Sequence, residues 1–324
     1  MVLALVAFSL LGFSIVMNLF LWVVYKRQYR FATILFDMLR FYPILTIIGL
    51  IASVGSDLYL SLAFSESFYW LLPFLLVNFG IQLRLFWQWF SLYRLKNYTE
   101  FLKNLRDSLH IRVISLNDWL AKPEKDPNCI LVLLRHDVDT DLNRARRMSD
   151  EEKKFNIPAC YYFRNNAEHY SLDEAAVLIK ELVSSRIFEI GFHYETVSNT
   201  GGDVKKAIAL FPKEVEKFQK IYPVRMISAH GDRIVHDVSK KPIALNHRLV
   251  SEKLVDIESL GLISSYQLPH DYYLSDAMGL HHFDSTYHFH DTYMRARFLD
   301  SLKLLDQLPK GTLVQILIHP DWWF

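Results

Sequence analysis

Two carboxylates stand close together at the end of an apolar run of the sequence. Asp137 and Asp139 follow the apolar residues 130–134, and Arg135 and His136 complete the segment. Neighbouring carboxylates repel each other unless a cation or a shared proton offsets the repulsion. The pair at the end of a buried strand therefore predicts a cation site whose other members come from elsewhere in the chain.

Charged and imidazole residues also follow the other apolar runs. They are Arg164, His193, Glu195, His230, Asp232, Arg233, His319 and Asp321. Catalytic residues collect at the carboxyl ends of the strands in a parallel sheet or barrel, so these groups are expected to share one edge. We interpret them as a site in which a divalent metal ion lies beside the two carboxylates. A purely structural role for all of them is the alternative.

Apolar runs alternate with amphipathic segments from about residue 110. Buried strands are predicted at 129–139, 157–165, 186–195, 224–232 and 312–323, with helices at 141–155, 171–185 and 202–222. Ser171 followed by Glu174 predicts a capping box, and Pro212 predicts an interruption of the last helix. This alternation is typical of an α/β fold with a parallel sheet or barrel.

The first part of the chain contains long uncharged stretches. Residues 1–25 hold no Asp, Glu, Lys or Arg, and residues 41–56 and 67–83 are also uncharged. A helix needs about 20 apolar residues to cross a bilayer core, so three membrane spans are expected. The alternative for each is a buried helix of a soluble protein. The start lacks the charged leader and cleavage site of a secretory signal, which favours a retained anchor.

Basic residues indicate an orientation for these spans. The loop at 26–40 is basic and the turn at 57–66 is not, whereas several basic residues follow the third stretch. The positive-inside rule then predicts an outside N-terminus and a cytoplasmic location for everything after residue 90. The basic stretch at 94–112 either binds anionic headgroups or forms a solvated helix face.

These patterns divide the chain into three expected parts. They are a transmembrane region at 1–95, a basic juxtamembrane connector at 96–128 and a catalytic domain at 129–324. The expected location is the inner or cytoplasmic membrane, which the chain crosses several times.

Five motifs across residues 130–324 resemble the polysaccharide deacetylase family, also called family 4 carbohydrate esterases. They are RHDVD, YYFR, EIGFHYE, SAHG and HPDWW, and together they are similar to a subgroup associated with surface-polysaccharide and O-antigen loci. The resemblance implies a distorted parallel (β/α) barrel. It also implies that Asp137 is the catalytic base, Asp139 and His193 are metal ligands, and His319 is the general acid.

The sequence departs from the family pattern at the second metal histidine, which would fall at Val197. His230 could replace it, because Gly231 after it gives the backbone freedom to bring the imidazole close. A strand extended through Glu195 would instead place that carboxylate on the face of His193. We favour His230, since a neutral imidazole adds no third carboxylate, and keep Glu195 as the alternate, with water or another group as a further possibility.

Other residues of these motifs have less specific expected roles. His230 is otherwise a substrate contact, and Glu195 a partner of Arg164 or of a metal-bound histidine. Residues expected to orient Asp137 or to contact the substrate, including a phosphate on it, are Arg135, Arg164, Arg233 and Tyr194. The histidine-rich segment 281–290 matches no standard metal pattern, so a surface or substrate loop is favoured over a second metal site.

The mixed Asp and His ligands fit Zn²⁺ best, with Co, Fe, Ni or Mn as alternatives. The resemblance and the predicted anchor together imply a metal-dependent amide hydrolase that removes an acetyl or formyl group from an amino sugar. Expected partners are the membrane, a lipid-linked or nascent glycan and polysaccharide-assembly proteins, but no nucleic acid. The alternatives are a deacetylase of a soluble nucleotide sugar and a non-catalytic glycan-binding or scaffold protein. Retention of both Asp137 and His319 favours an enzyme, because a binding protein needs neither.

Overall fold

The computed structural model describes residues 94–232, 234–237, 239–240, 242–276, 279–283, 289–290 and 305–323. They belong to the second of the two units into which the chain divides, Tyr93–Phe324. The three expected membrane spans lie outside the described residues, as does Arg233. Among the described residues, no helix is both long enough and apolar enough to cross a bilayer.

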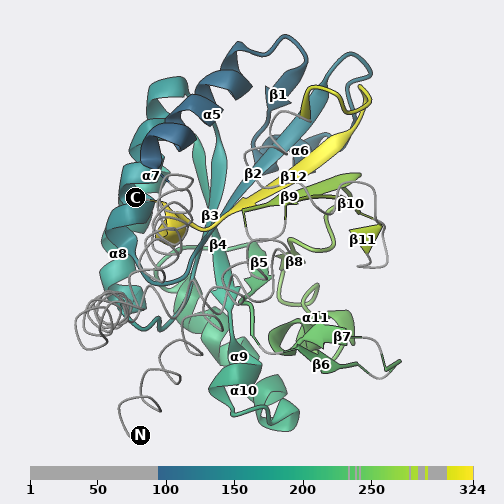
Figure 1. Ribbon diagram of the computed structural model, residues 1–324. Helices are drawn as coiled ribbons and strands as arrows, with labels where there is room; N and C mark the ends of the chain where they lie inside the picture. The colour runs from purple at the N-terminus through teal and green to yellow at the C-terminus, as the bar shows by residue number, and fades with distance from the viewer. Residues whose placement is uncertain are drawn as a thin grey trace, which may run out of the picture. The chain divides into compact units, whose positions relative to one another are not determined.

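A curled, mostly parallel sheet forms the centre of this unit and makes a half-barrel (Figure 1). The strands along its main path are β11 (Phe289–His290), β10 (Gly279–Phe283), β9 (Tyr272–Ser275), β12 (Leu313–Ile318), β2 (Ile130–Val138), β3 (Ala159–Phe163), β4 (Phe188–Tyr194), β5 (Met226–Ala229) and β8 (Ile263–Ser264). Pairing is parallel from β9 to β8, and β10 and β11 extend the sheet antiparallel. The expected α/β class and all five expected strands are confirmed.

Strand β2 is buried along its whole length, between β12 on one side and β1 (Ile111–Val113) and β3 on the other. An apolar run covered on both faces is typical of a central parallel strand. Because side chains alternate along a strand, Arg135 and Asp137 lie on one face and His136 on the other. The same alternation places Leu131 and Leu133 on the face of Asp137.

Side chains fill the inside of the curl. The buried cluster there consists of Leu116, Trp119, Leu131, Leu133, Cys160, Tyr162, Met226, Leu268 and Leu313. Leu116 and Trp119 come from the short helix α6 (Leu116–Ala121), which begins at the capping residue Ser115. The polar groups at the carboxyl ends of the strands therefore lie next to a packed apolar cluster.

The three expected helices are also present as α7 (Leu142–Phe155), α8 (Leu172–Ser184) and α10 (Val204–Gln219). The predicted capping box of α8 is confirmed, with reciprocal bonds between Ser171 and Glu174. The expected interruption at Pro212 is wrong, because α10 continues through it. Proline removes one hydrogen bond from a helix interior, but a buried face that includes Phe211 and Val215 holds this helix against its surroundings.

Residues 96–128, expected as a connector, contribute α5 (Leu95–Asp107), β1 and α6 to the domain. Helix α5 packs on α7, and Tyr98 in its first turn contacts the Trp323 ring at 5.4 Å between centroids. The Tyr98 hydroxyl donates to the buried Glu152, whose Oε1 lies 2.6 Å from His136 Nε2. The start of α5 thus lies near the carboxyl end of β2.

The remaining elements are short and follow β5 or the strand ends. They are α9 (Thr196–Asn199), the antiparallel hairpin of β6 (Ile234–His236) and β7 (Pro242–Ala244), η2 (Leu245–His247), α11 (Arg248–Ser251) and η3 (Pro320–Trp322).

Candidate metal centre

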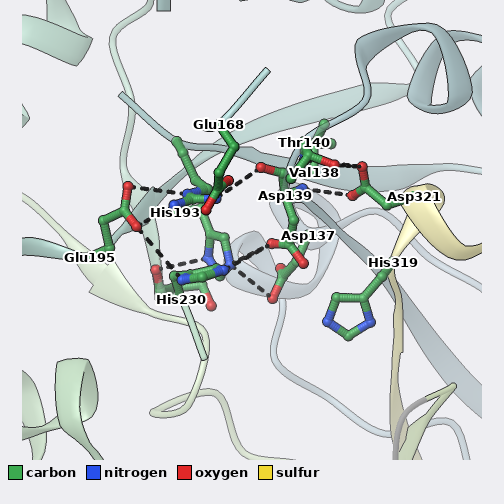
Figure 2. Close-up of polar contacts among 12 residues, drawn as sticks. Asp137, Val138, Asp139, Thr140, Glu168, His193, Glu195, His230, His319 and Asp321 are labelled. Atoms are coloured by element: carbon green, nitrogen blue, oxygen red, sulfur yellow. Dashed lines mark hydrogen bonds and ion pairs between the residues drawn. The ribbon is translucent and has the colours of Figure 1, made fainter. Parts of the chain in front are cut away.

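Asp139, His193 and His230 converge at the carboxyl edge of the sheet (Figure 2). One ligand atom from each lies within 4.8 Å of the others. His193 Nε2 is 3.4 Å, and His230 Nε2 3.6 Å, from Asp139 Oδ1. Ligands about 2.1 Å from a tetrahedral Zn²⁺ lie about 3.4 Å apart. Asp139 Oδ1 is buried and has no hydrogen-bond partner among the described residues, so the three side chains fit a divalent cation.

The two histidines are oriented in the same way. Each directs Nε2 toward Asp139, while Nδ1 faces an acceptor. His193 Nδ1 lies 3.2 Å from the Ser228 carbonyl oxygen, and His230 Nδ1 lies 3.7 Å from Glu195 Oε2. A hydrogen bond to an acceptor at Nδ1 fixes the proton there and leaves the Nε2 lone pair for a metal. The Ser228 carbonyl lies within hydrogen-bond distance of His193, and the Glu195 carboxylate is a close acceptor on the same side of His230.

Electrostatics favour the protonation states that a metal needs. Burial lowers the pKa of His230 to about 4, with only partial opposition from Asp139, so its imidazole is neutral at neutral pH. Burial raises the pKa of Asp139, but the nearby imidazoles of His193, His230 and His319 outweigh it, and the pKa falls below its ordinary value. A neutral imidazole and an ionised carboxylate are the forms that bind cations.

The structure places Glu195 outside this triad. Strand β4 ends at Tyr194, and Glu195 has φ −136° and ψ 31° at the start of α9, so the strand is not extended through it as the ligand role required. Its carboxylate instead accepts hydrogen bonds from Arg164 Nε, at 3.1 Å, and Nη2. Glu195 is therefore the partner of Arg164 and lies on the Nδ1 side of the His230 ring.

Gly231 does not have the role expected for it. Its φ is not positive, so no special backbone conformation brings His230 to the site. Register does: β5 pairs with β4 so that Ser228 lies beside His193, and the His230 amide donates to the Tyr194 carbonyl at 2.8 Å.

Asp137 lies beside the triad in a bidentate pair with Arg135. Arg135 Nε donates to Asp137 Oδ1 at 2.8 Å and Nη2 to Oδ2 at 2.6 Å, with both side chains buried. Asp137 Oδ2 is 3.5 Å from His193 Nε2. Burial raises the pKa of Asp137, but the charge of Arg135 and its hydrogen bonds lower the pKa by more, so the net shift is downward. Asp137 is thus an ionised, oriented carboxylate beside the candidate metal ligands.

Arg135 is 2 % exposed, and each of its three guanidinium nitrogens donates to a neighbouring side chain. It also donates to the hydroxyls of Ser228 and, at 3.0 Å, Ser265. Its guanidinium lies over the rings of Tyr162 and Tyr266, at 5.2 Å and 5.1 Å from their centroids. The structure therefore supports the orienting role expected for Arg135.

His319 is positively charged, opposite in sign to Asp137. In Figure 2 its ring lies on the side of Asp137 away from the two triad histidines. Nδ1 of His319 is 2.7 Å from Asp276 Oδ1, and its ring stacks on Trp322 at 4.4 Å. Burial lowers its pKa, but the charge of Asp276 and the hydrogen bond to it raise the pKa to about 9. His319 is therefore an imidazolium at neutral pH.

The sequence pattern did not indicate Asp276. This residue directly follows the short strand β9, whose residues YYLS form no apolar run. It also accepts from the His319 amide at 2.8 Å and from Trp323 Nε1 at 3.2 Å. The one signal available was an acidic residue directly after a short aromatic strand.

His247 is a second residue that the sequence pattern did not indicate. It lies in η2, and its ring is 4.2 Å from that of Tyr266, whose hydroxyl is 3.4 Å from Arg135 Nη2. Burial and the charge of Arg135 lower its pKa to about 3. It adds a neutral imidazole to the surroundings of Arg135.

Two further residues hold the loop after β2. Asp321 accepts from the Asp139 amide at 2.8 Å and from the Thr140 amide at 3.0 Å. Arg164 Nη1 donates to the Asp139 carbonyl at 3.0 Å and to Glu168 at 2.6 Å. Because Arg164 is occupied by these acceptors and Glu195, the geometry does not support its expected contact with a substrate phosphate.

The remaining sequence-predicted residues lie elsewhere. Tyr194 is 1 % exposed and meets the Phe211 ring edge-on at 5.2 Å, so it packs in the core, on the face of β4 opposite His193, and does not contact a substrate. Arg233 and the side chains of segment 281–290 lie outside the described residues. No family model matches the chain, and no curated protein matches it. The resemblance to polysaccharide deacetylases stays a prediction.

Proposed function

We propose that this chain is a metal-dependent amide hydrolase that removes an acetyl or formyl group from an amino sugar. One observation carries the proposal: the candidate metal triad is flanked by an acid and a base in opposite protonation states. The pKa of Asp137 is lowered and that of His319 is raised to about 9. Two titratable groups whose environments push their pKa values apart are typical of an acid–base pair.

Asp139, His193 and His230 would hold the ion, which supplies polarisation of the amide carbonyl and of a water molecule. Asp137 accepts the proton of the attacking water as general base, and Arg135 keeps it ionised and oriented. His319 donates a proton to the leaving nitrogen. Because Nδ1 of His319 is bonded to Asp276, Nε2 is the donating atom.

Zn²⁺ is the proposed metal. Three protein ligands from imidazole and carboxylate groups, with one position open, are typical of catalytic zinc sites. Co, Fe, Ni and Mn accept the same ligands. With this chemistry we propose that the half-barrel is the distorted (β/α) barrel of the polysaccharide deacetylases, which the sequence motifs resemble.

A lipid-linked or nascent surface glycan at the cytoplasmic membrane face is the proposed substrate. The uncharged stretches 1–25, 41–56 and 67–83 support it, because an anchored enzyme meets membrane-bound sugars. Polysaccharide-assembly proteins are the proposed partners. A soluble nucleotide sugar is the alternative substrate. A binding or scaffold role is disfavoured, since a binding protein needs neither the carboxylate of Asp137 nor the imidazolium of His319.

Mass spectrometry of lipid-linked glycans from cells with and without the protein tests the proposal. Deacetylation removes the mass of ketene from the glycan, and deformylation removes that of carbon monoxide. Cells that carry Asp137→Asn are the control and should show the unmodified glycan. An unchanged glycan in cells with the active protein would contradict the proposal.

A further inference from the structure

Arg164 connects the two sides of the candidate metal triad. It follows β3, the strand between β2 and β4, so it lies between Asp139 at the end of β2 and the residues that follow β4. Its side chain is 6 % exposed. The guanidinium donates to the Asp139 carbonyl at 3.0 Å and, through Nε and Nη2, to both oxygens of Glu195.

The backbone of Arg164 is held as firmly as its side chain. Its amide donates to the Tyr170 hydroxyl at 3.0 Å, and that hydroxyl donates to the Val138 carbonyl at 2.5 Å. Arg164 is therefore fixed to the residue that precedes Asp139. Both the main chain and the guanidinium of Arg164 are therefore held in place. The planar guanidinium forms two parallel hydrogen bonds with a carboxylate and loses little conformational freedom in doing so, which a lysine ammonium cannot match.

His230 needs an orienting group more than His193 does. His193 is 1 % exposed and has a main-chain carbonyl at Nδ1. The His230 side chain is 23 % exposed, and the acceptor that faces its Nδ1, at 3.7 Å, is Glu195 Oε2 (Figure 2). Without an acceptor there, the proton of a neutral imidazole can move to Nε2 and block the lone pair that a metal requires.

We propose that Arg164 and Glu195 form a positioning pair for the metal. Glu195 holds His230 in the tautomer that offers Nε2, and Arg164 fixes Glu195 and the main chain of Asp139 relative to each other. The pair acts through the ligands and touches neither metal nor substrate. This inference rests on the metal site of the proposed function. It explains how a histidine from the next strand serves where Val197, buried in α9, offers no ligand.

Glu168 provides a matched control. Its carboxylate accepts from the same guanidinium, Nη1 of Arg164, at 2.6 Å, but among the described contacts it has no ion pair with a triad histidine. Glu195→Gln and Glu168→Gln each remove one negative charge next to Arg164 without changing side-chain size. Only Glu195→Gln weakens the acceptor that faces Nδ1 of His230.

The test is a zinc titration of the purified full chain, stripped with a chelator, in competition with a chromophoric chelator. Glu195→Gln and Arg164→Lys should each weaken zinc binding by about 10–100-fold, as loss of an outer hydrogen-bond partner typically does. Glu168→Gln should bind zinc like the wild type. Glu195→Asp, which restores the charge, should recover part of the affinity, and His230→Ala should lose it.

Cobalt supplies a second measurement, because the visible spectrum of bound Co²⁺ reports ligand geometry directly. Glu195→Gln should shift this spectrum, and Glu168→Gln should leave it unchanged. Wild-type affinity and spectrum in Glu195→Gln, or equal loss in both glutamine variants, would overturn the proposal. Full metal content in His230→Ala with loss in Glu195→Ala would overturn it too and make Glu195 the ligand. Zinc binding that depends on His230 without amide hydrolysis would refute only the proposed function.

Discussion

Asp276 Oδ1 lies 2.7 Å from His319 Nδ1, and the other oxygen of the same carboxylate accepts the His319 amide at 2.8 Å. One buried aspartate thus fixes both the ring and the main chain of the proposed general acid. The pair mirrors Arg135 and Asp137 with the signs reversed: a buried cation holds the base ionised, and a buried anion holds the acid protonated.

The first prediction concerns the pH dependence of turnover. The pKa of His319 is raised to about 9 mainly by Asp276, so the protonated acid is present below this pH and is lost as pH rises through it. Asp276→Asn should move the alkaline limb of the kcat profile toward the ordinary histidine value of about 6.5. A bound cation lowers the pKa in both proteins, so the shift between them is the measurement. If the wild type and Asp276→Asn had the same alkaline limb, His319 would not be the general acid.

The second prediction separates the two carboxylates of the RHDVD motif. Asp137→Asn should retain the metal and lose about 10²–10⁴-fold in turnover, because an amide cannot accept the proton of the water. Asp139→Asn should lose both metal and turnover. Metal content by elemental analysis and initial rates on the same samples check this. Full rate in Asp137→Asn would assign the base elsewhere.

The third prediction concerns the packing of β4 against the inside of the curl. A Cβ on Gly191 would lie 2.3 Å from a ring atom of Tyr162, and that ring packs under the Arg135 guanidinium. Gly191→Ala should therefore destabilise the domain by about 1–3 kcal/mol, as overpacking does. Gly231→Ala is the control, because a Cβ there meets nothing within 4 Å. Equal urea midpoints for the two variants would contradict the expected clash.

The fourth prediction concerns topology. The sequence predicts three spans, an outside N-terminus and a cytoplasmic domain. An enzyme reporter that works only in the cytoplasm, fused after Phe324, should be active. A second fusion with a reporter that works only outside the membrane should be silent, and activity of this second fusion would reverse the assignment.

The sequence predicted the central strands because apolar runs such as residues 130–134 form buried strands in a parallel sheet. It also brought together Asp139, His193 and His230, since strand ends meet at one edge. The sequence left the role of Glu195 open between a metal ligand and a partner of Arg164. Strand β4 ends at Tyr194, whose side chain points away from the site, and the chain turns at Glu195, which accepts hydrogen bonds from Arg164.

Asp276 could not be predicted in the same way. The strand before it has four residues, mostly aromatic or polar, and pairs with β12, which is about forty residues later in the chain. Only the pairing of β9 with β12 places Asp276 beside His319. A partner that depends on such a distant pairing leaves no local pattern in the sequence.

Tyr98, in the first turn of α5, contacts Trp323 and the buried Glu152 near the carboxyl end of β2. The chain therefore enters the domain at the edge that holds the triad, with no long linker between Arg94 and that edge. A short connection to a membrane anchor, which the sequence predicts at residues 1–92, would give a high effective concentration of membrane-bound ligands near the domain. Under the proposed function, lipid attachment of the sugar would then determine its access to the site as much as the sugar's own shape.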